Sequence, residues 1–296
     1  MNWASDWLDD TEPNTSAEHD RSDADHPAAT SEIADETPGP DAEIDDAAPD
    51  PDAEVAAAAV LPSSSVLGPS GVLVVGVGGG VGTTTTAAGL AAALRTNGFF
   101  AAGVDASADG GDLIERTVGH SLRHGEWMLD DGILWGRRAL GDRAGEALAA
   151  STSDSLLRAV GYFPVYDAGN ALHARHLEPL ITDPALSVVL VVASRGDSVN
   201  RLPARLDWIR THIGEDALED VTVAVATTRP GRTPVAEHLR THLEGHVSAV
   251  CEIGHDTALA TGGQIRWEDL NEAARADYRQ LAAAIQAAPS PETDMQ

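Results

Sequence analysis

A glycine-rich segment holds the residues of this sequence that are best suited to chemistry. It follows the apolar, β-branched run 72–77 and precedes an Ala- and Leu-rich stretch, 83–96, that has the composition of a helix. Glycines let the backbone turn its N–H groups around an anion, and the helix N-terminus adds partial positive charge. The Thr84 hydroxyl, two places after the last glycine, is placed to coordinate Mg²⁺. We therefore predict a phosphate-binding loop made of Gly78, Gly79, Gly80, Val81, Gly82, Thr83, Thr84 and Thr85.

Two aspartates are the acidic candidates for the same site. Asp105 follows the predicted strand 99–104, and Asp167 follows the short apolar segment 165–166. Because the carboxyl ends of parallel strands share one edge of a sheet, we expect both carboxylates beside the loop. We interpret both as ligands of Mg²⁺, partly through water, and Asp105 also as a residue that positions water for catalysis. The alternative interpretation is that both are solvated carboxylates in turns.

Strand-like and helix-like segments alternate along the chain after residue 70. The predicted strands are 72–77, 99–104, 165–166, 187–193, 221–226 and 247–253, and the predicted helices are 83–96, 154–160, 198–213, 235–243 and 267–287. Repeated strand–helix–strand units with right-handed crossovers predict an α/β fold with a doubly wound, mostly parallel sheet flanked by helices. Proline cannot donate to a central strand ladder, so we expect the strand before Asp167 to begin after Pro164.

Composition divides the chain into three parts. Residues 1–67 contain 18 acidic residues and one arginine, with Pro, Ala, Ser and Thr between them. Such a stretch has too little apolar surface to offset the entropy cost of ordering it. We therefore predict a disordered acidic N-terminal tail at 1–68, a folded domain at 69–288 and a disordered C-terminal tail at 289–296.

The first ten residues differ from the rest of the acidic tail. One helical turn would place Trp3, Trp7 and Leu8 on one face, with three aspartates beside them. One hypothesis is a docking peptide at 1–10 that folds into the groove of a protein partner. The other is an incidental terminus, or one that docks on its own domain.

Charge and cysteine content limit the classes of function. The net charge of −28 argues against binding to DNA or to an anionic membrane surface. The single cysteine, Cys251, allows no disulfide within the chain, and no apolar run is long enough for a signal core or an integral membrane segment. These features predict a cytoplasmic protein. All 19 Lys+Arg residues are arginines, a bias that is typical of GC-rich bacterial genomes.

The glycine-rich segment resembles the deviant Walker A motif of the ParA/MinD family of P-loop ATPases, Lys-Gly-Gly-Val-Gly-Lys-Thr-Thr. Residues 79–82 and 84–85 match this pattern position by position. The two lysines do not match, because the family's signature lysine falls on Gly78 and its P-loop lysine falls on Thr83. The loop is therefore identified as a degenerate member of that motif.

The resemblance continues downstream and covers most of residues 71–288. Asp105 matches the first of two aspartates that the family places after a strand, and Ser107 replaces the second. The segment that ends in Asp167 is similar to the Walker B strand end, and 254–263 is similar to the family's C-terminal segment. The resemblance implies a P-loop NTPase fold, with ATP or ADP and Mg²⁺ as the ligands.

The missing lysines bear on the function that the resemblance implies. In the family the P-loop lysine binds the β- and γ-phosphates, and the signature lysine reaches a phosphate across a dimer. Without these cations we predict weakened nucleotide binding and impaired hydrolysis. The leading hypothesis is a positioning or regulatory adaptor for a bacterial secretion, pilus, conjugation or partition machine. The alternatives are an active ATPase of DNA segregation or complex positioning, working as a homodimer, and a nucleotide-free scaffold that dimerises with an intact paralogue.

Overall fold

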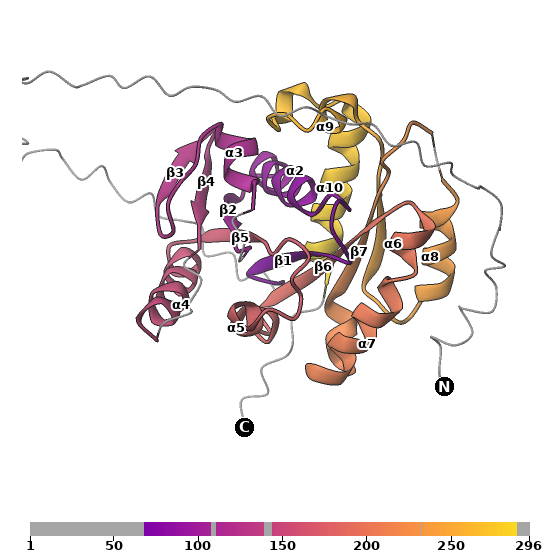
Figure 1. Cartoon of the computed structure of the whole chain (residues 1–296), viewed down its shortest axis with the longest axis horizontal. Coiled ribbons are helices and arrows are strands. Elements are labelled where there is room, and N and C mark those ends of the chain that lie inside the picture. Colours follow the sequence, from indigo (N-terminus) through magenta and orange to yellow (C-terminus); the bar gives the residue numbers. More distant parts are fainter. Residues whose placement is uncertain (1–67, 108–110, 139–143, 232, 289–296) are drawn as a thin grey trace, which may run out of the picture. The chain divides into compact units, whose positions relative to one another are not determined.

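The apolar, β-branched segments of the sequence form a central sheet of eight strands (Figure 1). The computed structural model describes residues 68–107, 111–138, 144–231 and 233–288. All of these belong to the second of the two units into which the chain divides, Ser63–Gln296. The predicted docking peptide at 1–10, with Trp3, Trp7 and Leu8, and the predicted C-terminal tail at 289–296 lie outside the described residues.

The strands form one mostly parallel sheet. They are β1 (Gly71–Gly76), β2 (Phe100–Asp105), β3 (Trp127–Asp130), β4 (Ile133–Arg137), β5 (Tyr162–Asp167), β6 (Leu186–Ala193), β7 (Val221–Ala226) and β8 (Ala249–Ile253). Their order across the sheet is β3-β4-β2-β5-β1-β6-β7-β8, and β3, at the edge, pairs antiparallel with β4. Every residue of β1 and β6 is buried, as expected of strands that are covered on both faces.

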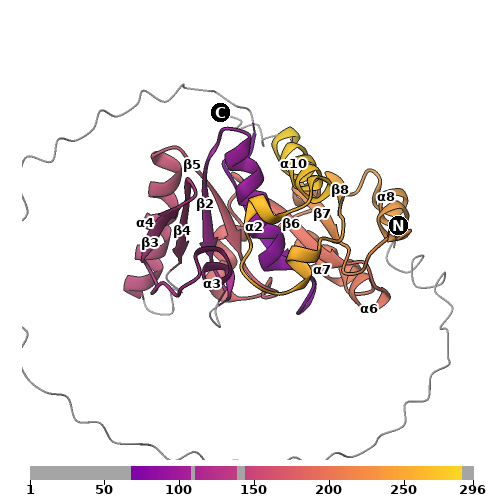
Figure 2. The same cartoon turned by 90° about the horizontal axis from the view of Figure 1, so that it is seen from above.

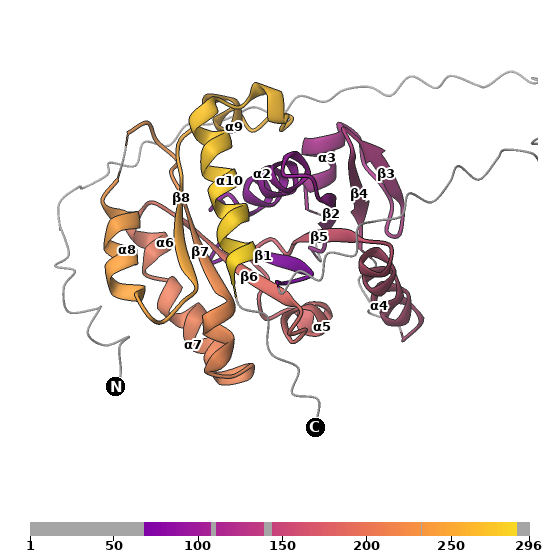
Figure 3. The ribbon, with the colours of Figure 1, turned by 180° about the vertical axis from the view of Figure 1, so that it is seen from behind.

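Helices cover both faces of the sheet. They are α2 (Thr83–Thr96), α3 (Leu113–Val118), α4 (Ala144–Ala159), α5 (Glu178–Ile181), α6 (Gly196–Val199), α7 (Leu202–His212), α8 (Val235–Leu243), α9 (Thr257–Ala260) and α10 (Glu272–Ala287), with 3-10 turns at Arg175–Leu177, Asp216–Asp220 and Trp267–Asp269. Figures 1 and 3 show α2 and α10 on one face and α4, α5 and α7 on the other. None of these helices is long and apolar enough to cross a bilayer.

The winding of the chain reverses at the centre of the sheet. β1 leads through α2 toward β2, whereas its neighbour β6 leads through α6 and α7 to β7 on the opposite side. The connections that leave β1 and β6 therefore diverge, and a crevice opens above the carboxyl ends of the two strands. Open α/β sheets bind their ligands at such a switch point. The predicted doubly wound, mostly parallel α/β fold is thus confirmed, and the glycine-rich loop lies at its switch point.

Pro164 lies inside β5, so the prediction that this strand begins after the proline is wrong. Pro164 pairs in register with Ala102 of β2, while pairing between β5 and β1 begins only at Val165, opposite Val72. The proline thus sits at the edge of the β1 ladder. A Cβ at Gly71 would come within 2.9 Å of the proline ring, so the glycine at the start of β1 leaves room for the ring.

Two helices are packed closely enough to fix the glycine-rich loop. Figure 2 shows α2 and α10 side by side above the sheet. The ring of Tyr278, on α10, lies so close to α2 that a Cβ at Gly89 would collide with it. The Tyr278 hydroxyl also donates to the backbone oxygen of Thr85, at 3.3 Å, in the first turn of α2. α10 therefore supports the end of α2 at which the loop enters the helix.

Candidate functional site

The glycine-rich loop connects β1 to the N-terminus of α2, as predicted. Its root is tied to β6 and to the segment just after β5, because the Gly76 N–H donates to Gly169 O at 2.7 Å and the Val77 N–H donates to Val191 O at 3.0 Å. Gly80 and Gly82 have φ angles of 68° and 93°. Side chains disfavour these left-handed conformations, and backbone nests for anions require them. The loop therefore has the backbone that phosphate binding needs.

Two adjoining cavities open on the loop. One, of about 480 Å³, is lined by Gly78–Gly80, Gly82, Thr83–Thr85, Asp112, Arg116, Gly169, Asn170, Leu259 and Gly262. The other, of about 280 Å³, extends toward the ends of β7 and β8 and is lined partly by Thr227, Ile253 and Tyr278. The cavities share Gly80, Gly82, Thr85 and Leu259. Together they have the size of a typical small-molecule site.

The predicted Mg²⁺ ligands Thr84 and Asp167 are brought together. Asp167 ends β5 and is fully buried, and its Oδ1 accepts from the Gly169 N–H at 3.0 Å. Burial raises the pKa of this carboxyl to about 6, although hydrogen bonds from Gly169 and the Thr84 hydroxyl act to lower it. Its Oδ2 is buried and accepts no hydrogen bond from the described residues. A buried, unpartnered carboxylate oxygen beside a threonine hydroxyl fits a hard cation such as Mg²⁺.

Asp105 also lies at this edge of the sheet, but other groups occupy its carboxylate. It is opposite Asp167 in the register of β2 and β5. Its Oδ1 accepts from the backbone N–H and the hydroxyl of Ser107, at 3.1 and 2.7 Å, and its Oδ2 lies 3.2 Å from Arg137 Nη2. Both oxygens thus have protein partners. In this arrangement the residue predicted to position water is committed to Ser107 and Arg137.

Two arginines that the sequence analysis did not assign to the site lie against the loop. Arg116, on α3, lines the larger cavity, and its Nη1 donates to Thr85 Oγ1 at 3.1 Å. Arg201, between α6 and α7, lies so close to Gly78 that a Cβ at Gly78 would collide with its Nη1. The only signal in the sequence was an indirect one, because a loop without lysines needs a cation from elsewhere.

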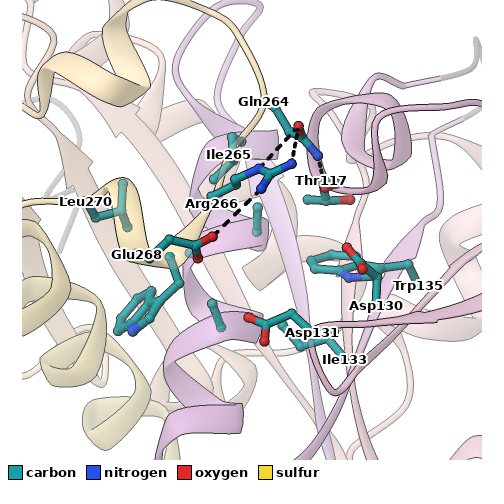
Figure 4. Close-up of a pocket in the computed structure, with 14 residues that line it drawn as sticks. Thr117, Asp130, Asp131, Ile133, Trp135, Gln264, Ile265, Arg266, Glu268 and Leu270 are labelled. Carbon is teal, nitrogen blue, oxygen red and sulfur yellow. Dashed lines mark hydrogen bonds and ion pairs between the residues drawn. The ribbon is translucent and has the colours of Figure 1, made fainter.

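A third cavity, of about 390 Å³, lies away from the loop (Figure 4). It is bounded by α2, the β3–β4 hairpin and residues 264–270, and it contains none of the predicted site residues. Several of its polar groups bind one another: Gln264 Nε2 donates to Thr117 O at 2.8 Å, and Arg266 donates to Gln264 Oε1 and pairs with Glu268. Among its described lining residues, this cavity has no glycine-rich loop or helix N-terminus of the kind that binds phosphate, so the loop is the better candidate for a functional site.

Comparisons with known proteins agree on the fold. No protein-family model matches the sequence, and no curated protein sequence matches it significantly. Among solved structures, a ParA family ATPase from Chlorobium tepidum TLS is 14% identical, with a TM-score of 0.53 over 75% of this chain and 97% of that one. A chain of the MinC:MinD cell division protein complex of Aquifex aeolicus is 12% identical, with a TM-score of 0.54 over 72% of this chain and 95% of that one. Apo McdA from Cyanthece is 12% identical, with a TM-score of 0.52 over 72% and 98%. The described part of this chain therefore has the fold of the ParA/MinD family of ATPases.

Proposed function

We propose that this chain binds a purine nucleotide with Mg²⁺ at the glycine-rich loop, hydrolyses it slowly or not at all, and acts as a positioning or regulatory adaptor. The observation that carries the proposal is the loop itself. It combines glycines in left-handed conformations with the N-terminus of α2, against which α10 packs. Two adjoining cavities open there, at the switch point of the sheet.

The two cavities suit different parts of a nucleotide, and this difference orients it in the site. The cavity of about 480 Å³ contains the glycines and the start of α2, which suit phosphates. The cavity of about 280 Å³ contains apolar Ile253 and the Tyr278 side chain, which suit a base. Thr227 also lines this smaller cavity, and its buried hydroxyl has no partner among the described residues. A polar group of a base would satisfy that hydroxyl.

The acidic residues and the hydroxyl supply a place for the metal ion. The Thr84 hydroxyl and Asp167, partly through water, would hold Mg²⁺, and the ion would offset phosphate charge. Asp105 is less suited to the water-positioning role, because Arg137 and Ser107 bind its carboxylate. The loop has no lysine to stabilise the charge that develops during phosphoryl transfer. Asp105, bound to Arg137 and Ser107, is not free to position water. This supports impaired hydrolysis.

The adaptor role is supported by the likeness in fold and by the sequence of the N-terminus. One structure of similar fold is a MinC:MinD cell division complex, and another belongs to the ParA family of ATPases. A nucleotide-dependent change in this fold could be transmitted to a protein partner, which the docking peptide at 1–10 would recruit. We propose that the partner belongs to a bacterial machine for secretion, pilus assembly, conjugation or partition.

Calorimetry with Mg-ATP tests nucleotide binding, and phosphate release tests turnover. We expect wild-type protein to bind, Thr84→Ala to bind more weakly only when Mg²⁺ is present, and Thr227→Val to bind more weakly with or without it. We expect wild-type turnover no faster than that of Thr84→Ala. Turnover well above that variant's would support the active ATPase, and no binding at all would support the nucleotide-free scaffold that pairs with a paralogue.

A further inference from the structure

Arg201 occupies the space that a side chain at the first loop position would need. With a Cβ built on Gly78, the Arg201 Nη1 would collide with it, and Cζ and Cδ would lie 3.4 and 3.5 Å away. The backbone of Arg201 is held in the short connection between α6 and α7, where its N–H donates to Ser198 O at 3.1 Å. The arginine thus reaches the loop from a fixed point on the other side of the switch point.

The backbone of Gly78 does not require a glycine, and Arg201 is its close neighbour. Unlike Gly80 and Gly82, Gly78 does not have a positive φ angle, so the conformation of the loop does not require glycine there. Any larger residue, including a lysine, would have to displace the Arg201 guanidinium. The guanidinium is the far end of a flexible, exposed side chain and can move, so Arg201 brings a cation to this position without excluding a larger residue from it.

The charge of Arg201 is not neutralised by a neighbouring acid. Within the described part of the chain, Arg201 has no carboxylate within ion-pair distance, whereas Arg116 pairs with Asp112 at 3.9 Å and Arg137 pairs with Asp105. Its near neighbour is another cation, because Arg201 contributes to lowering the pKa of Arg205, after burial. An exposed, unpaired guanidinium beside an anion-binding loop is suited to bidentate contact with phosphate.

The loop places Arg201 at the end that the terminal phosphate would occupy. Gly82, where the loop enters α2, lies near Ala226 at the end of β7, on the side of the smaller cavity. Gly78 and Gly79 line only the larger cavity, and the Gly79 position is near Asn170, beyond the end of β5. With the base in the smaller cavity, the phosphate chain would run from Gly82 toward Gly78.

We propose that Arg201 binds the terminal phosphate of a nucleoside triphosphate held by the same chain, in place of the missing lysines, so that the site selects triphosphates over diphosphates. This inference rests on the proposed nucleotide function. It assigns a selectivity to a residue outside the loop, and it makes a test possible that compares two ligands on one variant.

Calorimetry with Mg²⁺ and either the non-hydrolysable triphosphate AMP-PNP or ADP tests the inference. We expect Arg201→Ala to weaken AMP-PNP binding at least about tenfold and ADP binding less than about threefold, with an unchanged thermal midpoint. Arg201→Lys keeps the charge but loses the planar fork, so its AMP-PNP affinity should lie between those of wild type and Arg201→Ala. Arg205→Ala, one turn further along α7, is the matched control and should retain the wild-type preference.

A second test places a positively charged side chain on the loop itself. Gly78→Lys in the wild-type background should gain little triphosphate affinity, because Arg201 already supplies a cation beside this position. In the Arg201→Ala background the same substitution should recover most of the lost affinity. Equal losses for AMP-PNP and ADP in Arg201→Ala, or no loss for either, would overturn the inference. If wild-type protein binds neither ligand, the proposed nucleotide function fails, which is a distinguishable result.

Discussion

The two lysine positions of the ParA/MinD pattern are filled in physically different ways. At Gly78 there is no side chain, and the guanidinium of Arg201 lies in the space beside it. At Thr83 a short side chain is buried at the start of α2, and it turns back toward Gly76 at the end of β1. A threonine cannot extend along the loop as a lysine would. The first position thus has a neighbouring cation, whereas the second has none of its own.

Thr83→Lys should strengthen nucleotide binding. The substitution places a cation where the family's P-loop holds one, on a backbone that already has left-handed Gly80 and Gly82. We expect Mg-ATP affinity to rise at least about tenfold, or about 1.4 kcal/mol, by calorimetry. Thr96→Lys, which adds the same charge at the exposed end of the same helix, should give no gain. An equal affinity in wild type and Thr83→Lys would indicate that the loop does not hold phosphate in that geometry.

Asp167 should make the stability of the ligand-free protein depend on pH. Its folded-state pKa of about 6 lies above its ordinary value of 3.8, so the folded state binds this proton more tightly than the unfolded state. The buried carboxylate therefore costs stability above about pH 6, and the cost disappears as the pH falls toward 4. Asp167→Asn removes the charge, and we expect it to be more stable than wild type by about 3 kcal/mol at pH 8.

Urea unfolding at several pH values measures this difference. The advantage of Asp167→Asn should shrink to about half at pH 5, where the wild-type carboxyl is largely protonated in the folded state. Asp197→Asn, at an exposed aspartate, should follow the wild-type profile. If Asp167→Asn were less stable than wild type at pH 8, the carboxylate would have a stabilising partner that the structure does not show.

Partners distant in sequence account for what residue-level prediction missed. The loop, Thr84 and Asp167 could be placed from the sequence, because strand ends and the starts of helices carry them to one edge of the sheet. The pairing of Asp105 with Arg137 could not, since the two are 32 residues apart and Arg137 lies on a strand that was not predicted. Arg201 was missed because its position depends on how α7 begins.

At the scale of elements, the strongly patterned segments were predicted most closely. The helices 83–96 and 235–243 have the bounds of α2 and α8, because α2 is rich in Ala and Leu between the glycine-rich loop and Gly98, and α8 buries one apolar face. The C-terminal helix begins at Glu272, five residues later than predicted, after a 3-10 turn and the Asn271 cap. The sequence signals were clear where an element is buried, and weaker where it begins or ends at the surface.

The hairpin of β3 and β4 was not predicted, although its turn has a recognisable signal. Asp131 and Gly132 both have positive φ angles, 45° and 72°, as the two-residue type I′ turn requires. Asp-Gly between β-prone residues is the usual sequence of that turn. The strand itself was hard to find, because β3 is short and no residue of it is fully buried.

Gly89→Ala should destabilise the protein, although alanine is the better helix former. In an exposed helix this change would stabilise by about 1 kcal/mol. Here the added methyl group collides with the Tyr278 ring, which is 1% exposed and cannot easily move. Overpacking of this kind costs about 1–3 kcal/mol, so we expect a net loss of about 1 kcal/mol in the free energy of unfolding.

Chemical denaturation of paired variants separates collision from other effects. In a Tyr278→Ala background the space is open, and Gly89→Ala should then be stabilising. A loss of similar size in both backgrounds would mean that the glycine is needed for a reason other than the ring. Tyr278→Ala itself removes the contact with Thr85, so nucleotide affinity is compared between wild type and the single Gly89→Ala variant, where we expect it to fall together with stability.

At the scale of the whole molecule, charge is distributed unevenly along the chain. Residues 1–67 carry 17 of the 28 net negative charges. Self-repulsion extends a charged linker, so we expect this segment to act as a long tether between the folded domain and whatever the docking peptide binds. The fold of the domain does not predict what the tether or the docking peptide does, because the effect of both depends on a partner.

Deleting residues 1–60 should separate recruitment from folding. We expect the thermal midpoint of the domain to stay nearly unchanged, because a segment this acidic and poor in aliphatic residues has little to pack on a core. The deletion should abolish recovery of the partner complex from native lysate, and Trp3→Ala with Trp7→Ala should reproduce most of that loss, since two aromatic side chains on one face can anchor a peptide in a groove. Deleting only 11–60, which keeps the peptide, should preserve recovery. A large drop in midpoint would show that the tryptophans dock on their own domain, and unchanged recovery in the tryptophan variant would assign the interaction to the folded surface.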